Sequence, residues 1–313
     1  MKKFLAIDGG GIKGLVPAAF LATIEEQIGE PISQYFDLIA GTSTGGIIAL
    51  GLGLGFPASE IVRFYDELGP RVFAGNRWLR RVRHLFFSKY QPEPLREALE
   101  AQFDRRLLGE STCRLVIPSL SLATGEIHIY KTAHHPRFEL DYKVPVVDVA
   151  LATAAAPTYF PAHWSSSGIP LVDGGMWANN PAGMAVVEAI GVLKWNPEEI
   201  LVLSLGCTTE PLTIGWGRVH ALGLTYWAGK VTDIFMRGQS SGSLGTAYTL
   251  LGHDRVLRIS PNVGKGEFSL DGVKDVRTLQ ALGRESARHE LPAIRRIFCN
   301  EPVESFQPFH MVT

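Results

Sequence analysis

Hydrophobic residues along this chain occur in two patterns, short continuous runs and longer stretches with helical spacing. Short runs are typical of strands buried on both faces, whereas apolar positions three or four residues apart indicate helices. We predict strands at Phe4–Ile7, Phe36–Ala40, Leu115–Leu122, Ile127–Tyr130, Ile169–Val172, Ile200–Leu205 and Val256–Ile259. We predict helices at Pro17–Ile28, Ile47–Leu54, Ser59–Leu68, Pro94–Phe103, Val146–Ala156, Pro181–Leu193, Val219–Leu251 and Val273–Phe298. Because strand and helix signals alternate, the pattern predicts one α/β domain with a mostly parallel sheet.

Composition supports a globular protein and excludes several classes. The 313 residues are 46% hydrophobic and 19% charged, which excludes a disordered chain. The 30 basic residues face 31 acidic ones, so no net positive charge attracts a nucleic acid polymer. The 33 glycines lie above the usual share of about 7% and have no collagen-like period. They therefore mark places where the backbone needs tight geometry.

The cysteine spacing and the N-terminal pattern favour a cytoplasmic protein. The cysteines form no CxxC pair, so neither a disulfide framework nor a metal site is expected. The apolar run Phe4–Ile7 is interrupted by Asp8 and three glycines, which makes it too short for a secretory signal. The most apolar stretch, Ile47–Phe56, is shorter than the roughly 20 residues that span a bilayer, so membrane contact is expected to be peripheral.

Two basic stretches qualify the neutral charge balance. Between Asn76 and Lys89, basic residues alternate with aromatic and apolar ones. Such a segment binds an anionic membrane surface or a phosphorylated ligand, or it is a surface loop whose aromatics fold back onto the core. The predicted C-terminal helix carries a second basic group, Arg284, Arg288, Arg295 and Arg296. These arginines either bind an anionic ligand or form a solvated helix face.

A glycine-rich loop follows the first predicted strand. The segment Asp8–Gly14, with the sequence DGGGIKG, lies between a strand and a helix, where backbone N–H groups can approach an anionic oxygen. The spacing of Gly9, Gly11 and Gly14 also matches the dinucleotide-binding fingerprint, so the loop fits a cofactor pyrophosphate or a reaction oxyanion. A ribose-binding acid should follow at the end of the next strand, which instead ends in Gly41–Ser43. This weakens the cofactor interpretation.

A second glycine motif, Gly41-x-Ser43-x-Gly45, matches a nucleophile elbow. A strained strand-to-helix turn exposes the serine hydroxyl, and small residues on either side let the strand and the helix pack closely. The segment Gly238–Gly242 matches the same pattern around Ser240, but it follows an amphipathic helix instead of a buried strand. We therefore expect Ser240 to mark a helix break and favour Ser43 as the nucleophile.

A third glycine motif, Asp173–Gly175, follows a short predicted strand. A serine nucleophile needs a base, and either a histidine or a carboxylate can serve. The paired glycines allow a tight turn that aims the Asp173 carboxylate, and burial in an apolar cleft would raise its pKa. His163 and His253 remain the alternative bases. Asp271 also precedes a glycine, but it is expected in an ordinary turn before a helix.

The order and context of the three motifs resemble the patatin-like phospholipase family. The resemblance runs over about 4–205, the motif-bearing core, and includes Ala154–Pro157 before the aspartate loop. It implies a single patatin-like domain over 1–313, with a central, mostly parallel sheet flanked by helices on both faces. A C-terminal helical part, about 218–300, would pack on the core. The implied activity is hydrolysis of phospholipid acyl esters, of the phospholipase A1 or A2 type, by a Ser–Asp dyad.

Carried over residue by residue, the resemblance assigns Ser43 as the nucleophile and Asp173 as the base that takes its proton. The oxyanion hole would be lined by the amides of Gly9, Gly10 and Gly11. The supporting positions are Lys13, which is the family's basic position in the first loop, and Gly41, Gly45, Gly174 and Gly175. Water then releases the fatty acid from the acyl-enzyme, so the resemblance implies no metal and no organic cofactor.

The region after Leu205 is less typical of plain storage or secreted patatins. In overall sequence character the chain is similar to bacterial patatin-like effectors of antiphage signalling, which a cyclic oligonucleotide activates. This second resemblance implies a cyclic di- or trinucleotide activator and peripheral contact with the inner membrane from the cytoplasm. The alternatives are a non-regulated esterase or lipase of lipid metabolism, a dinucleotide-dependent oxidoreductase and an inactive binding protein on the same fold. Three properties stay open at this point: the acyl position that is cleaved, the preferred phospholipid head group, and whether the chain forms a homo-oligomer.

Overall fold

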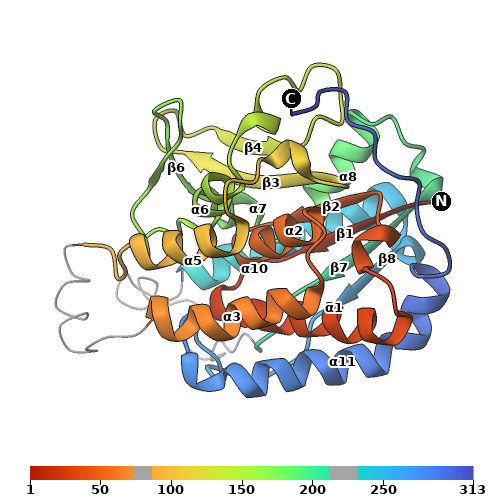
Figure 1. Cartoon of the computed structure of the whole chain (residues 1–313). Helices are drawn as coiled ribbons and strands as arrows, with labels where there is room; N and C mark the ends of the chain where they lie inside the picture. The colour runs from red at the N-terminus through yellow and green to blue at the C-terminus, as the bar shows by residue number, and fades with distance from the viewer. Residues whose placement is uncertain (74–86, 212–230, 313) are drawn as a thin grey trace, which may run out of the picture.

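An eight-stranded mixed sheet runs through the centre of the molecule (Figure 1). The structure is a computed structural model that describes residues 1–73, 87–211 and 231–312. The strands are β1 (Lys2–Ile7), β2 (Leu38–Gly41), β3 (Arg114–Ser121), β4 (Ile127–Lys131), β5 (His163–Trp164), β6 (Pro170–Asp173), β7 (Ile200–Leu205) and β8 (Val256–Ile259). Their order is β5-β6-β3-β2-β1-β7-β8, with β4 paired to β3 outside this path. Strands β3, β2, β1, β7 and β8 are parallel, whereas β4, β5 and β6 add antiparallel pairs at one end.

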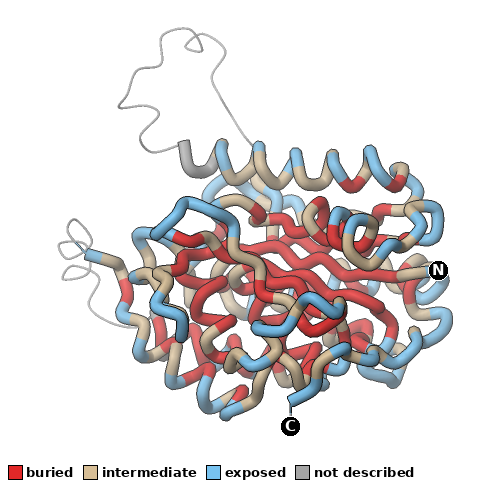
Figure 2. Tube along the Cα trace, turned by 90° about the horizontal axis from the view of Figure 1, so that it is seen from above, coloured by how far each residue is buried: buried red, intermediate tan, exposed pale blue. Residues whose placement is uncertain are grey.

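Helices cover both faces of the sheet. They are α1 (Leu15–Ile28), α2 (Thr44–Gly53), α3 (Ala58–Phe73), α5 (Glu93–Phe103), α6 (Val146–Ala154), α7 (Gly175–Ala178), α8 (Ala182–Gly191), α10 (Val231–Leu251) and α11 (Val276–Ile297). Successive strand residues point to opposite faces. On β1, Leu5 and Ile7 join the core with α1, α2, α3, α5, α6 and α11, whereas Phe4 and Ala6 join the core with α8 and α10. Figure 2 shows the buried strands between these layers.

Short 3-10 helices connect several of these elements. They are η1 (Gly11–Gly14), η2 (Ile32–Tyr35), η3 (Leu108–Glu110), η4 (Asp141–Lys143), η5 (Pro197–Glu199), η7 (His253–Arg255) and η8 (Val273–Asp275). The last of them leads directly into α11, so the predicted helix from Val273 begins as a 3-10 turn.

The structure confirms the predicted α/β class, with a parallel central part of the sheet and helices on both faces. Every predicted strand is present, with ends within two residues of the prediction. The pattern does not predict β5, because a strand of two residues carries no periodicity. The predicted helix Val219–Leu251 is described from Val231 onward, and 219–230 lies outside the described residues. Among the helices of the described ranges, none combines the length and apolar character needed to cross a membrane.

The predicted helix break at Ser240 is wrong. Ser240 lies inside α10, which continues unbroken from end to end. The Ser243 hydroxyl donates to the Asn180 carbonyl oxygen at 2.6 Å and accepts from the Gly183 amide at 2.9 Å. These bonds fasten α10 to the start of α8. Such tertiary contacts outweigh the low helix propensity of the glycines in α10.

The pairing of β3 brings two loops together that are far apart in the sequence. Val116 pairs with both β2 and β4, so these strands lie on opposite edges of β3. Ser119 pairs with both β4 and β6, so β6 lies on the same edge as β2. Because β2 is parallel and β6 antiparallel to β3, the two strands run toward each other. The end of β2 at Gly41 therefore approaches the end of β6 at Asp173.

The C-terminal helix α11 lies along α1 (Figure 1). The contact is close at Gly283, where a methyl group would lie 2.4 Å from the Val16 carbonyl oxygen. The segment after α11 is fastened by the buried Lys3 ammonium, which donates to the carbonyl oxygens of Phe298 and Glu301 at 2.9 and 2.7 Å. The C-terminal helical part thus contacts the core, whereas the prediction that 1–313 forms a single domain stays a prediction.

The substitution Gly283→Ala is expected to lower the free energy of unfolding by about 1–3 kcal/mol, because the added methyl group forces α11 away from α1. The matched control is Gly242→Ala in α10, where an added methyl group meets nothing within 4 Å among the described residues. This control should gain about 0.5–1 kcal/mol from helix propensity. Urea denaturation measures both changes. A Gly283→Ala protein as stable as the parent would contradict the close contact.

Candidate active site

Ser43 lies in a sharp turn between β2 and α2. Its backbone has φ 55° and ψ −123°, a conformation that a non-glycine residue adopts only under strain. A methyl group at Gly41 would lie 2.1 Å from the Gly45 carbonyl oxygen, and one at Gly45 would lie 2.2 Å from the Ile7 carbonyl oxygen. The Ser43 amide donates to Thr153 Oγ1 at 3.0 Å. The glycines thus make room for the turn, and Thr153 holds it.

The Ser43 hydroxyl faces a buried carboxylate. Ser43 Oγ donates a hydrogen bond of 2.6 Å to Oδ2 of Asp173. The other carboxylate oxygen, Oδ1, accepts from the Gly175 amide at 2.6 Å. Asp173 is 5% exposed, and this burial raises its pKa to about 6, although the hydrogen bonds from Ser43 and Gly175 act in the opposite direction. At neutral pH the carboxylate is mostly ionised and can accept the Ser43 proton.

The glycine loop Asp8–Gly14 lies beside Ser43, at the C-terminal end of β1. A methyl group at Gly9 would lie 3.2 Å from Cβ of Ser43 and 2.6 Å from Oδ1 of Asn179. The Gly9 amide donates to the Asn179 carbonyl oxygen at 3.0 Å. Of the three glycines predicted to supply oxyanion donors, Gly9 therefore already has an acceptor for its amide.

The amides of Gly10 and Gly11 have no acceptor among the described residues. The Gly9 carbonyl oxygen faces the Cys207 thiol at 3.7 Å, and the Gly10 carbonyl oxygen accepts from the Lys13 amide at 3.2 Å. Because the N–H and C=O groups of a trans peptide point in opposite directions, the Gly10 and Gly11 amides point away from these partners. Such free donors, close to the N-terminus of α2, suit an oxygen that gains negative charge.

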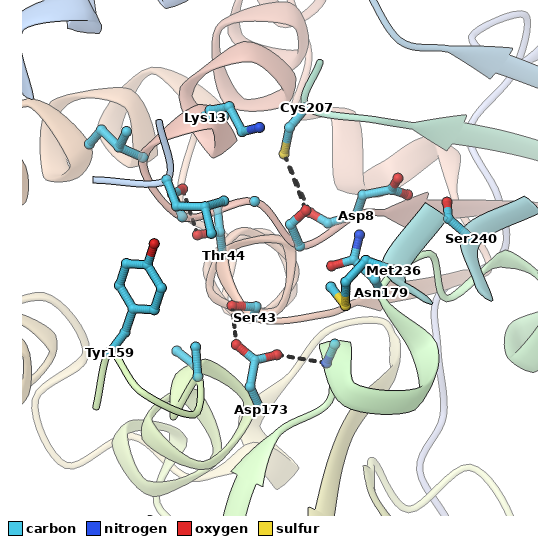
Figure 3. A pocket seen from close by; sticks show the side chains of 18 of the residues that line it. Asp8, Lys13, Ser43, Thr44, Tyr159, Asp173, Asn179, Cys207, Met236 and Ser240 are labelled. Carbon is cyan, nitrogen blue, oxygen red and sulfur yellow. Dashed lines mark hydrogen bonds between the residues drawn. The ribbon is translucent and has the colours of Figure 1, made fainter. Parts of the chain in front are cut away.

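Ser43 and Asp173 line a pocket of about 990 Å³, shown in Figure 3. Helices α2, α3 and α5 contribute apolar side chains to its lining, namely Ile47, Leu68 and Leu95. Helix α10 contributes a mixed set, Met236, Ser240, Ser241 and Leu244. In Figure 3 the Ser43 and Asp173 side chains face each other, and Thr44 is drawn between Ser43 and Lys13. The pocket is large enough for a lipid acyl chain and lies directly beside a serine hydroxyl.

The structure brings the remaining predicted site residues to the same place. Lys13 lines the pocket, with Nζ 3.9 Å from Oε1 of Glu210. A methyl group at Gly174 would lie 2.2 Å from the Pro118 carbonyl oxygen, so this glycine lets the turn after β6 lie against β3. Gly175 also lines the pocket and holds Asp173 through its amide.

Neither of the alternative histidine bases contacts Ser43. His163 Nε2 lies 3.4 Å from Oδ1 of Asp148, and the His253 ring stacks on Tyr248. Both histidines are absent from the pocket lining within the described ranges. The basic stretch between Asn76 and Lys89 falls outside the described residues up to position 86, so its predicted ligand contacts stay predictions.

Sequence reasoning missed two polar residues that shape the site. Thr153 Oγ1 accepts from the Ser43 amide and donates to the Pro118 carbonyl oxygen at 2.6 Å, which ties the turn to β3. Asn179 accepts from Gly9 through its backbone carbonyl group, and its side chain lies beside the same glycine. A signal for Thr153 was available, because it is the one hydroxyl residue within the alanine-rich helix 146–156. Asn179 carried no comparable signal.

Comparisons with a family profile, with known proteins and with solved structures each find proteins similar to this chain. The family profile described as Patatin-like phospholipase matches residues 5–186. A Pseudomonas aeruginosa protein named cGAMP-activated phospholipase is 34% identical over 316 residues, covering 97% of this chain and 90% of that protein. An Escherichia coli protein of the same name is 33% identical over 342 residues, covering 97% and 94%. Among solved structures, VipD from Legionella pneumophila matches with a TM-score of 0.46 and 12% identity, over 93% of this chain and 67% of that chain.

The substitution Asp173→Asn is expected to raise the free energy of unfolding at pH 8. Because burial raises the pKa of Asp173 from 3.8 to about 6, the folded protein holds this proton more tightly than the unfolded chain does. The wild-type protein therefore loses up to roughly 3 kcal/mol as the pH rises through this window, and asparagine removes that loss. Urea denaturation should show the full gain at pH 8 and only a small part of it at pH 4. Equal stability at pH 8 would contradict the raised pKa.

Proposed function

The chain belongs to the patatin-like phospholipase family, and we propose that it is a serine lipid acyl hydrolase of the phospholipase A type. The observation that carries the proposal is the 2.6 Å hydrogen bond from Ser43 Oγ to the buried Asp173 carboxylate, inside a partly apolar pocket. In such a dyad the aspartate itself is the proton acceptor, so no histidine is required.

In the proposed reaction, Ser43 Oγ attacks the acyl carbonyl carbon while Asp173 takes its proton. A pKa of about 6 leaves the carboxylate ionised at neutral pH and makes it a stronger base than an exposed aspartate. The developing oxyanion accepts hydrogen bonds from the amides of Gly10 and Gly11, and the N-terminus of α2 favours the same charge. Asp173 then returns the proton to the leaving alcohol, and water hydrolyses the acyl-enzyme to release the fatty acid.

The proposed substrate is a membrane phospholipid. The apolar side chains from α2, α3 and α5 accommodate an acyl chain, and the ester carbon then lies next to Ser43. We propose that the enzyme works from the cytoplasm and contacts the inner membrane peripherally. Catalysis by the dyad and the glycine loop uses only groups of the chain and water.

We also propose that a cyclic di- or trinucleotide activates the enzyme as part of antiviral defence. Two relatives that align with 97% of this chain are named cGAMP-activated phospholipases. That alignment extends well beyond the family profile, which ends at residue 186. The similarity to these relatives therefore includes the C-terminal part of the chain. Only some residues of that part line the pocket beside Ser43.

The substitution Ser43→Ala is expected to lower kcat for fatty-acid release roughly 10⁴-fold or more, because it removes the nucleophile. Asp173→Asn should lower kcat about 10³-fold or more, because the amide cannot take the Ser43 proton. Fatty-acid release from phospholipid vesicles measures both, and circular dichroism checks that the variants are folded. A fluorophosphonate should label Ser43 in the wild-type protein.

The control for this experiment is Ser240→Ala, which removes the serine of the second Gly-x-Ser-x-Gly match. Ser240 lies within α10 and lines the pocket, but it has no carboxylate partner among the described contacts. This variant should therefore still be labelled at Ser43 and should retain turnover, because the nucleophile and its base are both present. Sustained turnover by Ser43→Ala, or near-normal turnover by Asp173→Asn, would rule out the dyad.

Addition of the activating cyclic nucleotide is expected to raise the wild-type rate of fatty-acid release at least about tenfold. Vesicles of phosphatidylethanolamine and phosphatidylglycerol serve as substrate, and cGAMP is the first of a panel of cyclic di- and trinucleotides. The linear dinucleotide with the same bases is the control. Equal rates with every cyclic nucleotide and without any would identify a constitutive lipid hydrolase instead.

A further inference from the structure

A short loop before α11, residues 269–272, contacts the glycine loop beside Ser43. The Leu270 carbonyl oxygen accepts a hydrogen bond from the Ile12 amide at 2.8 Å. A methyl group at Gly11 would lie 2.2 Å from the same oxygen, and Gly11 has a φ of 58°. The 269–272 loop therefore lies directly against the peptide that joins Gly11 to Ile12.

This peptide is held at both of its polar ends. Leu270 binds its N–H group, and the Thr44 hydroxyl donates to its carbonyl oxygen, that of Gly11, at 2.7 Å. Glycine backbones have wide conformational freedom, so a run of three glycines keeps one orientation only where hydrogen bonds restrain it. Rotation of this peptide would redirect the neighbouring Gly11 amide, which is one of the two donors proposed for the oxyanion.

Asp271 anchors the loop that carries Leu270. Its Oδ2 accepts from Lys89 Nζ and, at 2.5 Å, from the Tyr90 hydroxyl, and its Oδ1 accepts from the Ser269 hydroxyl at 3.3 Å. The Lys89 and Asp271 side chains are 28% and 15% exposed, so the ion pair is partly shielded from water. Burial alone would raise the pKa of Asp271, but the hydrogen bonds from Lys89 and Tyr90 lower it, and the carboxylate stays ionised.

Lys89 and Tyr90 are tied in turn to the wall of the pocket. Their amides donate to the carbonyl oxygens of Thr158 and Tyr159, each at 2.8 Å. The Lys89 ammonium also lies 5.1 Å from the centre of the Tyr159 ring. Thr158 and Tyr159 both line the pocket, and Figure 3 shows the Tyr159 ring facing it. Asp271 thus links this wall to the glycine loop.

We propose that Asp271 is a positioning residue for the oxyanion hole: its ion pair with Lys89 holds the 269–272 loop so that Leu270 fixes the Gly11–Ile12 peptide. The inference rests on the proposed function, because it concerns transition-state stabilisation at Ser43. It extends that function to residues outside the dyad and the glycine loop. Asp271 touches no reacting atom and acts only through its neighbour Leu270.

The expected kinetic effect follows from this indirect role. A displaced oxyanion donor weakens transition-state binding and leaves ground-state binding nearly unchanged. Asp271→Asn keeps the shape of the side chain and removes the charge that pairs with Lys89. It should lower kcat about 10- to 100-fold with KM within about twofold of wild type. Lys89→Met should act similarly, and the double variant should lose little more than either single one, because all three lack the same ion pair.

The experiment measures kcat and KM of the full chain on the soluble ester p-nitrophenyl butyrate, with and without cGAMP, so that membrane binding does not enter. The second readout is the rate constant of inactivation by a fluorophosphonate, whose reaction with Ser43 uses the same oxyanion site. This rate constant should fall in parallel with kcat. A merely structural defect would instead reduce the fraction of protein that is labelled at the end point.

Two further variants serve as controls. Glu267→Gln changes an exposed carboxylate close to the 269–272 loop that accepts from the Gly264 amide at 2.6 Å. It should keep kcat within about twofold of wild type, because its partner is not part of the site. Asp271→Glu retains the charge and should recover part of the activity that Asp271→Asn loses.

Two results would overturn the inference while leaving the proposed function intact. One is an Asp271→Asn protein with wild-type kcat and a wild-type inactivation rate. The other is a double variant whose loss equals the product of the two single losses, since Asp271 and Lys89 would then act independently. If the wild-type protein neither hydrolyses the ester nor is labelled at Ser43, with cGAMP or without, the proposed function fails and the inference fails with it.

Discussion

The hydrogen bond from Ser43 to Asp173 depends on the way in which β3 is paired. One edge of β3 accommodates first the parallel strand β2 and then the antiparallel strand β6, so the two strands end face to face. Each end must then turn at once, because the other strand blocks its path. The strained φ at Ser43 and the contact of Gly174 with the Pro118 carbonyl oxygen are consequences of this crowding. Asp173, at the same junction, is only 5% exposed although it lines the pocket.

Burial of Asp173 has opposite effects on the stability of the fold and on the reactivity proposed for this carboxylate. Removing an ionised carboxylate from water destabilises the folded protein, and the hydrogen bonds from Ser43 and Gly175 offset only part of that loss, because the pKa remains raised. The raised pKa is also what makes an aspartate a useful base near neutral pH.

A second buried carboxylate, Asp8, has a charged partner, unlike Asp173. It accepts bonds of 2.8 and 2.5 Å from the Arg258 guanidinium, which fixes the start of the glycine loop to β8.

The part of the chain that follows β7 completes the candidate site, although the three glycine motifs all precede β7. Arg258 of β8 holds Asp8, Cys207 after β7 lies against Gly10, and Leu270 holds the peptide after Gly11. Three separate segments thus restrain a loop that its glycine content would otherwise leave free. The predicted turn at Asp271 is a turn, but its carboxylate also binds Lys89, a contact between residues that no local pattern relates.

Hydrophobic patterning predicts every strand except β5, and the glycine motifs predict where the chain must turn tightly. Strands buried on both faces leave continuous apolar runs, and a Gly-x-Ser-x-Gly turn needs its glycines next to the serine, so both signals are local. Residue patterns alone left Asp173, His163 and His253 as possible partners of Ser43. In the structure Asp173 contacts Ser43, and the Gly9 amide already has an acceptor. The structure also shows that Ser240 continues a helix. Each of these outcomes depends on contacts between residues far apart in the chain, which are set by strand pairing and packing.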